Sequence, residues 1–191
     1  MSLIPAFEIG VWNAWVFMPY LFLIIILVGK LKEGEDPGKT ELDALSKNEK
    51  RIFNSAMLIF LAALIYSVFL PLKLGTIWFY VGLPITLIGL VTLTIVIMNF
   101  ATTSWDKPIT KGLYHYSRHP MYIATAVFLL GVGIASASWL FLLLSIIFTI
   151  LNSLRTIHEE RFCLDKYGDA YREYMNRTPR WIGIPESGGA S

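Results

Sequence analysis

The stretch Pro120–Leu154 reads PMYIATAVFLLGVGIASASWLFLLLSIIFTILNSL, 35 residues without one Asp, Glu, Lys, Arg or His. A helix that crosses a bilayer needs about 20 mostly apolar residues, so this stretch is too long for one ordinary span. It predicts either one overlong, tilted helix or two short helices that turn at Ser136-Ala137-Ser138. Each arm of such a hairpin would hold only about 17 residues, which is short for a full crossing.

Three further stretches of the chain also lack charged side chains, and only 16% of the 191 residues are charged. Soluble domains are typically about a quarter charged. Inside lipid the backbone finds no water to bond with, so such stretches must be helical. We therefore expect an all-α integral membrane bundle rather than a soluble one, with three more spans at about Val11–Gly29, Ile52–Lys73 and Ile77–Phe100.

The positions of Lys and Arg decide between the two readings of the long stretch. If it is a hairpin, the chain has five spans, and 15 of the 16 basic residues fall on one side, with Lys73 alone on the other. With four spans the split is 9 to 7. Because basic loops stay in the cytoplasm, the pattern favours about five transmembrane helices, with the N-terminus outside and the C-terminus cytoplasmic. Gly131 and Ala135 are spaced for close helix contact within the hairpin.

Polar residues gather in two segments, Thr110–Tyr122 and Arg155–Arg180, one on each side of the hairpin. A helical hairpin brings its two ends together, so we expect these segments to be neighbours. Pro120 suits the first turn of a helix, and the free N–H groups there favour an anion such as a carboxylate. Arg118 would add a guanidinium that binds a carboxylate through two bonds. The alternative is that Arg118 and the histidines anchor the chain near lipid phosphates.

The second polar segment carries the adjacent carboxylates Glu159 and Glu160. Two carboxylates are unfavourable for simple anchoring, because cytoplasmic leaflets are themselves negative. As helix neighbours they point about 100° apart, so one could face the hairpin partner and the other the solvent. An apolar and aromatic set recurs at helical spacing, namely Ile157, Leu164, Tyr167, Tyr171 and Tyr174, which predicts an amphipathic helical cap lying on the membrane. The alternative is that the tyrosines serve packing and interface placement alone.

In these two segments the sequence resembles the isoprenylcysteine carboxyl methyltransferase family and its wider relatives, the membrane phospholipid N-methyltransferases. The elements that carry the resemblance are Gly112-x-Tyr114 followed by Arg118-His119-Pro120-x-Tyr122, the pair Glu159-Glu160, and Tyr167-Gly168-x-x-Tyr171-x-x-Tyr174 running to Arg177. One departure is Ala124, which stands where the family often has Gly.

The resemblance implies an S-adenosylmethionine-dependent methyltransferase, with the cofactor entering from the cytoplasm and a lipid-bearing substrate entering from the bilayer. Arg118 and Glu159 are the implied catalytic residues. Arg118 would orient an acceptor carboxylate, and Glu159 would hold the amino group or ribose of the cofactor. The implied cofactor-binding residues are Gly112, Leu113, Tyr114, His115, His119, Pro120, Tyr122, Glu159 and Glu160. We expect no metal site and no nucleic-acid partner.

The expected organisation has two parts. Residues 1–106 would hold the first three transmembrane helices and a cytoplasmic loop at 30–51, which carries six basic and six acidic residues and predicts a connector with a short surface helix. Residues 107–191 would form the catalytic part, with the cofactor loop, the hairpin and the cytoplasmic tail.

Several acceptors and functions stay open at this point. The first is the C-terminal carboxylate of an isoprenylated cysteine, which is already ionised and needs no general base. The second is a phosphatidylethanolamine-type lipid, whose ammonium must lose a proton first, with Glu160 or His115 as the base. A sterol-type reductase would need a longer chain and a nicotinamide, and a small membrane scaffold would bind no S-adenosylmethionine. The membrane would be the cell membrane in a prokaryote and the endoplasmic reticulum in a eukaryote.

Overall fold

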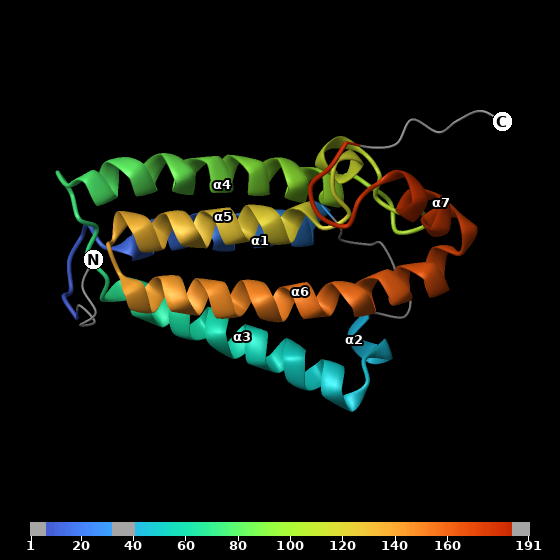
Figure 1. Cartoon of the computed structure of the whole chain (residues 1–191), viewed down its shortest axis with the longest axis horizontal. Coiled ribbons are helices and arrows are strands. Elements are labelled where there is room, and N and C mark those ends of the chain that lie inside the picture. Colours follow the sequence, from blue (N-terminus) through green and yellow to red (C-terminus); the bar gives the residue numbers. More distant parts are fainter. Residues whose placement is uncertain (1–6, 32–40, 185–191) are drawn as a thin grey trace.

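The computed structural model describes residues 7–31 and 41–184, and within these ranges the regular elements are all helical. The long helices run side by side along the molecule, and α7 lies at one end (Figure 1). This arrangement confirms the expected all-α bundle with a C-terminal hairpin. The elements are η1 (Ala14–Phe17), α1 (Met18–Leu31), α2 (Glu41–Ala44), α3 (Lys47–Val68), α4 (Ile77–Ala101), η2 (Gly112–His115), α5 (Pro120–Ala135), α6 (Trp139–Tyr167) and α7 (Asp169–Arg177).

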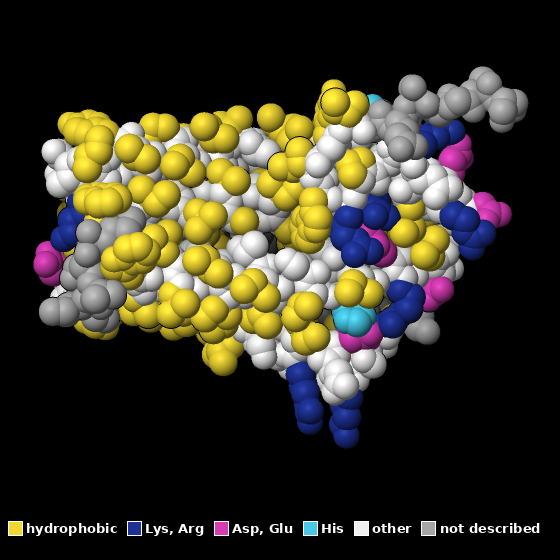
Figure 2. Space-filling model, viewed as in Figure 1, with side chains coloured by type: hydrophobic (Ala, Val, Ile, Leu, Met, Phe, Trp, Pro, Cys, Tyr) yellow, Lys and Arg dark blue, Asp and Glu magenta, His cyan; other side chains and the backbone are white. Residues whose placement is uncertain are grey.

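Three of these helices, α3, α4 and α6, are long and apolar enough to cross a bilayer. Two shorter apolar helices accompany them, one at Ala14–Val28 and the other α5. Hydrophobic side chains cover the length of the bundle on the face that Figure 2 shows, and charged side chains gather toward the end that carries α7. The five predicted spans therefore correspond to three long and two short apolar helices. Which side of the membrane each end faces stays a prediction.

The uncharged stretch from Pro120 to Leu154 forms the hairpin, so one overlong helix is excluded. The chain turns at residues 136–138, as the sequence predicts, and Ala137 adopts a left-handed conformation there with a φ of 50°. Ser138 begins the second arm, because its Oγ accepts a hydrogen bond from the Phe141 N–H at 3.2 Å. Helix α6 then continues beyond the apolar stretch to Tyr167, which carries the charged residues from Arg155 onward past the bundle.

Small residues let α4 and α5 approach closely. A Cβ added at Gly131 would overlap Thr86 of α4, and one added at Gly82 would overlap Ala135. Gly131 and Ala135 therefore lie against α4, and the prediction that they make their contact within the hairpin was wrong. The spacing of small residues indicates that some helix comes close, but it does not say which one. Within the hairpin the tight position is Gly133, which faces α6.

Helix α3 begins earlier and ends earlier than the predicted span Ile52–Lys73. Ser46 and Glu49 form a capping box, so the basic residues that follow Ser46 belong to the start of α3 and not to the loop at 30–51. At the other end Asn13 donates to the Val68 carbonyl at 2.8 Å and satisfies part of the helix terminus. Helix α2 is the expected short helix of the loop, and residues 32–40 lie outside the described residues.

Candidate functional site

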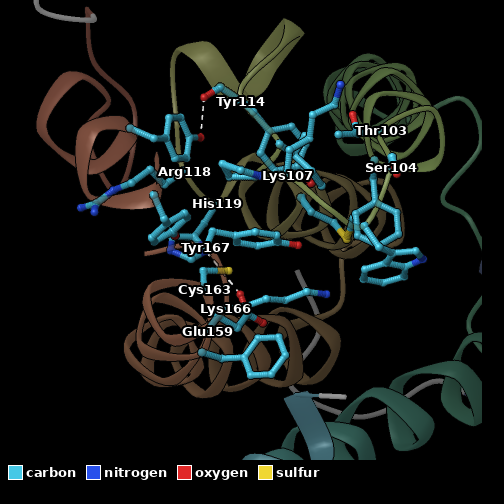
Figure 3. A pocket seen from close by; sticks show the side chains of 18 of the residues that line it. Thr103, Ser104, Lys107, Tyr114, Arg118, His119, Glu159, Cys163, Lys166 and Tyr167 are labelled. Carbon is cyan, nitrogen blue, oxygen red and sulfur yellow. Dashed lines mark hydrogen bonds and ion pairs between the residues drawn. The ribbon is translucent and has the colours of Figure 1, made fainter. Parts of the chain in front are cut away.

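A cavity of about 310 Å³ lies at the end of the bundle that carries α7. The two polar segments meet there, as the hairpin geometry predicts. Figure 3 shows side chains entering the cavity from three directions, and Tyr171 and Tyr174 of α7 complete the wall. The labelled residues are Thr103, Ser104 and Lys107 after α4, Tyr114, Arg118 and His119 before α5, and Glu159, Cys163, Lys166 and Tyr167 on α6.

Local turn chemistry fixes the segment that precedes α5. Pro120 occupies the first turn of α5, where its missing N–H is harmless, and His119 is the N-cap residue. The His119 N–H donates to Ser117 Oγ at 3.1 Å, so this backbone donor has a partner, although the His119 side chain makes no capping bond. Gly112 has a φ of +61°, and a Cβ there would overlap the amide of Asn99. The backbone conformation at position 112 and the close approach of Asn99 therefore both require glycine.

His119 joins the two glutamates of α6. Its Nε2 lies 3.1 Å from Glu160 Oε1, and its Nδ1 lies 3.4 Å from Glu159 Oε2. Burial by itself would lower the pKa of His119, but the hydrogen bonds and charges of Glu159 and Glu160 raise it above its ordinary value of 6.5. The imidazole thus bridges two carboxylates, which favour its protonated form.

Arg118 lines the cavity, and its guanidinium lies beside Glu160. Its side chain is only 10% exposed, and its Nη1 lies 3.4 Å from Glu160 Oε1. Its Nε and Nη1 atoms are buried and make no hydrogen bond to any residue that the structure describes. Both atoms are shielded from the open space of the cavity, and Nη1 is ion-paired with Glu160.

The two glutamates have different surroundings. Glu159 lines the cavity, accepts a hydrogen bond from the Tyr122 hydroxyl, and lies 3.5 Å from Arg155 Nη2. Glu160 is not among the residues that line the cavity, and its side chain is 5% exposed. The Arg180 guanidinium holds it through Nε at 3.0 Å and Nη2 at 2.6 Å. Glu160 thus faces the start of the hairpin at His119, and Glu159, whose side chain is 21% exposed, is partly open to solvent.

Tyr174 ties α7 to the segment before α5. Its hydroxyl donates to the Tyr114 carbonyl at 2.6 Å and lies 3.4 Å from the Ser117 carbonyl (Figure 3). Burial raises the pKa of Tyr174, so the hydroxyl keeps its proton and remains a donor. The predicted helical cap thus closes the cavity by packing two tyrosines against it.

The predicted cofactor-binding residues are divided between two places. Four of them line the cavity beside Arg118, namely Tyr114, His119, Tyr122 and Glu159. Three line a separate and more open hollow next to Ile95, Lys111 and Tyr116, namely Gly112, Leu113 and His115. The remaining two, Pro120 and Glu160, line neither, and their roles stay predictions.

Sequence reasoning missed part of the cavity wall. Lys166 lies on the wall with its Nζ 5.0 Å from the centre of the Trp105 ring and 5.3 Å from that of Tyr167. Helical spacing would have found it, since Glu159, Cys163 and Lys166 follow at i, i+4 and i+7 and so share one face of α6. No comparable pattern marks Arg180, which follows the last helix in a segment without periodicity.

This chain is similar to known proteins. The phospholipid methyltransferase family model matches residues 72–170. The protein-S-isoprenylcysteine O-methyltransferase of Schizosaccharomyces pombe is 32% identical over 78 residues, which cover 40% of this chain and 32% of that protein. The enzyme of the same name from Dictyostelium discoideum is 27% identical over 172 residues, 78% of this chain and 67% of that protein. The aligned chain thus spans about a third of the first relative and two thirds of the second.

The family match covers more than half of the chain and includes α4, the cavity segment before α5, the hairpin and the paired glutamates. It confirms the resemblance that the sequence motifs suggest. The chain belongs to the phospholipid methyltransferase family.

Proposed function

We propose that this protein is an integral membrane S-adenosylmethionine-dependent methyltransferase that methylates the C-terminal carboxylate of an isoprenylated cysteine. The observation that carries the proposal is the cavity that Arg118, His119 and Glu159 line together. The names of the two aligned relatives support the same acceptor.

The cavity residues fit the methyl donor. At about 310 Å³ the cavity reaches the lower end of the range typical of small-molecule sites. Glu159 would hold the amino group or ribose of the cofactor, and the Tyr122 hydroxyl donates a hydrogen bond to the Glu159 carboxylate. Tyr114 and His119 add ring surfaces beside it. When bound, S-adenosylmethionine supplies an electrophilic methyl group on a positively charged sulfur.

The acceptor carboxylate needs orientation rather than activation, because it is already ionised. Arg118 would bind it through two N–H groups and aim one oxygen along the line of transfer, with the reacting atoms about 3 Å apart. Lys107 and Lys166 place two further cations around the cavity. Phe100, Met121 and Phe162 give the cavity an apolar side that suits the hydrocarbon part of a lipidated substrate.

A phospholipid amine is the second candidate acceptor, and the description of the matching family favours it. An ammonium acceptor must first lose a proton to a base within hydrogen-bond reach. The two predicted bases are badly placed for this step. Glu160 is buried behind the wall against Arg180 and His119, and His115 lines the other hollow. The geometry therefore favours the carboxylate.

The proposed orientation places the cavity in the cytoplasm and the N-terminus outside. It is supported by the 15 of 16 basic residues that a five-span arrangement collects on one side. The substrate would then enter from the bilayer and the cofactor from the water phase. The division into residues 1–106 and a catalytic part at 107–191 belongs to the same proposal.

The test is an acceptor assay with purified protein in vesicles and methyl-labelled S-adenosylmethionine. We expect a base-labile methyl ester on synthetic farnesylcysteine and no label on phosphatidylethanolamine in the same vesicles. Farnesylcysteine amide, which lacks the ionised carboxylate, is the matched control and should stay unlabelled. Label on phosphatidylethanolamine with none on farnesylcysteine would assign the protein to the second candidate.

A further inference from the structure

The end of the described chain crosses the segment before α5. We call residues 178–183 the C-terminal strap; it lies beside the loops at the α7 end of the bundle (Figure 1). The strap is attached by hydrogen bonds to the residues that precede α5, close to the cavity. These bonds run from the Arg118 N–H to the Pro179 carbonyl at 3.0 Å, from the Gly183 N–H to the Tyr116 carbonyl at 3.2 Å, and from Ser117 Oγ to the Arg180 carbonyl at 3.3 Å.

Arg180 is the one residue of this strap whose side chain reaches the paired glutamates. Its Nε and Nη2 contact the two different oxygens of Glu160, at 3.0 Å and 2.6 Å. Two-point contacts of this kind fix the plane of a carboxylate as well as its position. The contact also raises the pKa of Arg180, chiefly because its guanidinium donates hydrogen bonds to the Glu160 carboxylate. Both oxygens of the Glu160 carboxylate are thus hydrogen-bonded.

Glu160 in turn contacts two residues of the cavity wall. His119 Nε2 lies 3.1 Å from Glu160 Oε1, and Arg118 Nη1 lies 3.4 Å from the same oxygen. Arg180 itself does not line the cavity, and its side chain is 41% exposed on the outer side. Arg180 is therefore placed to influence the wall without touching a ligand.

We propose that Arg180 is a positioning residue, which sets the His119 ring and the Arg118 guanidinium by holding both oxygens of Glu160. The C-terminal strap then belongs to the cofactor and acceptor site, although it contributes no side chain to the cavity. This inference rests on the proposed methyl transfer. Small displacements of positioning groups reduce turnover strongly, because the reacting atoms must stay aligned.

A purely structural role for Arg180 makes a different prediction. Arg180→Gln would then lower the fraction of folded protein, and the apparent kcat would fall with it while KM stayed unchanged. A positioning role predicts an unchanged unfolding midpoint, because Glu160 keeps His119 and Arg118 as partners. It predicts instead that KM for S-adenosylmethionine rises about tenfold or more and kcat falls in the folded enzyme.

A double-mutant cycle tests whether Arg180 acts through Glu160. The variants are Arg180→Gln, Glu160→Gln and both together, with Arg180→Lys as the conservative variant. Arg172→Gln is the matched control, because Arg172 is an exposed arginine of α7 that pairs only with Asp169 among the described residues. Each variant is assayed for methyl transfer, for the affinity of S-adenosylhomocysteine by calorimetry, and for its unfolding midpoint.

We expect the double variant to be no worse than Glu160→Gln alone, since contacting residues in one network are not additive. Arg180→Lys should recover part of the loss, and Arg172→Gln should match the wild type. Wild-type kinetics in Arg180→Gln would overturn the inference, as would losses that multiply in the double variant. If Glu160→Gln fails to fold, the comparison of Arg180→Gln with Arg180→Lys tests the positioning role of Arg180 by itself. A wild type that does not bind S-adenosylhomocysteine would refute the proposed function instead.

Discussion

Replacing Arg118 by alanine should lower methyl transfer at least ~100-fold, which corresponds to about 2.7 kcal/mol of transition-state stabilisation. The size follows from the burial of the side chain, which is 10% exposed and keeps two buried nitrogens without hydrogen bonds to the described residues. Donors in such surroundings act on a ligand with little screening by water. The protein should stay folded, because Glu160 retains Arg180 and His119 as partners.

The assay measures initial rates with synthetic farnesylcysteine at saturating S-adenosylmethionine. Arg118→Lys keeps the charge but loses the planar fork, so it should fall between wild type and Arg118→Ala. Arg172→Ala controls for the loss of one surface charge and should keep full activity. Unfolding midpoints and the affinity for S-adenosylhomocysteine should stay close to wild type in all three variants. Near-full activity of Arg118→Ala would refute the orienting role. A loss of S-adenosylhomocysteine affinity as large as the loss of methyl-transfer rate would mean that Arg118 binds the cofactor instead.

Three further predictions concern the supports of the site. Gly89→Leu should destabilise the protein by about 1–3 kcal/mol or more, because a Cβ at Gly89 already overlaps Phe128 of α5; an unchanged midpoint in thermal unfolding would contradict this packing. Gly112→Ala should cost about 1–2 kcal/mol, since its φ of +61° is left-handed and the new methyl group would overlap Asn99; unfolding in detergent measures it, and wild-type stability would speak against it. Because the pKa of His119 is raised in the folded protein, its protonation should contribute stability that is complete below pH 6.5 and is lost as pH rises through the folded-state pKa. In His119→Gln the unfolding midpoint should therefore depend less on pH over that range. An unchanged pH dependence would be evidence against the bridge between His119 and the two glutamates.

Much of the bundle could be predicted because lipid imposes a simple constraint on sequence. The hairpin followed from the charge-free stretch at Pro120–Leu154 together with the one-sided distribution of Lys and Arg. What the sequence left open was the pairing of helices. Gly131 and Ala135 indicate a close approach, but only the structure shows that α4 is the partner. The start of α3 was also missed, because the capping box at Ser46 lies inside a charged segment that resembles a loop.

In the site, too, the residues marked by a local sequence pattern could be predicted, and the residue placed only by the tertiary fold could not. Arg118, His119 and Glu159 carry motif signals, and the hairpin brings them to one cavity. Lys166 could have been found by helical spacing from Glu159. Arg180 could not, because its contact with Glu160 depends on the path of the C-terminal strap, and a non-helical segment has no periodicity to read.

Calorimetric titration of S-adenosylhomocysteine into the detergent-purified protein addresses the cavity most directly. The structure predicts saturable binding of one molecule per chain, weakened when Glu159, the carboxylate on the cavity wall, is replaced by glutamine. A flat titration of correctly folded wild-type protein would mean that this end of the bundle holds no methyl-donor site.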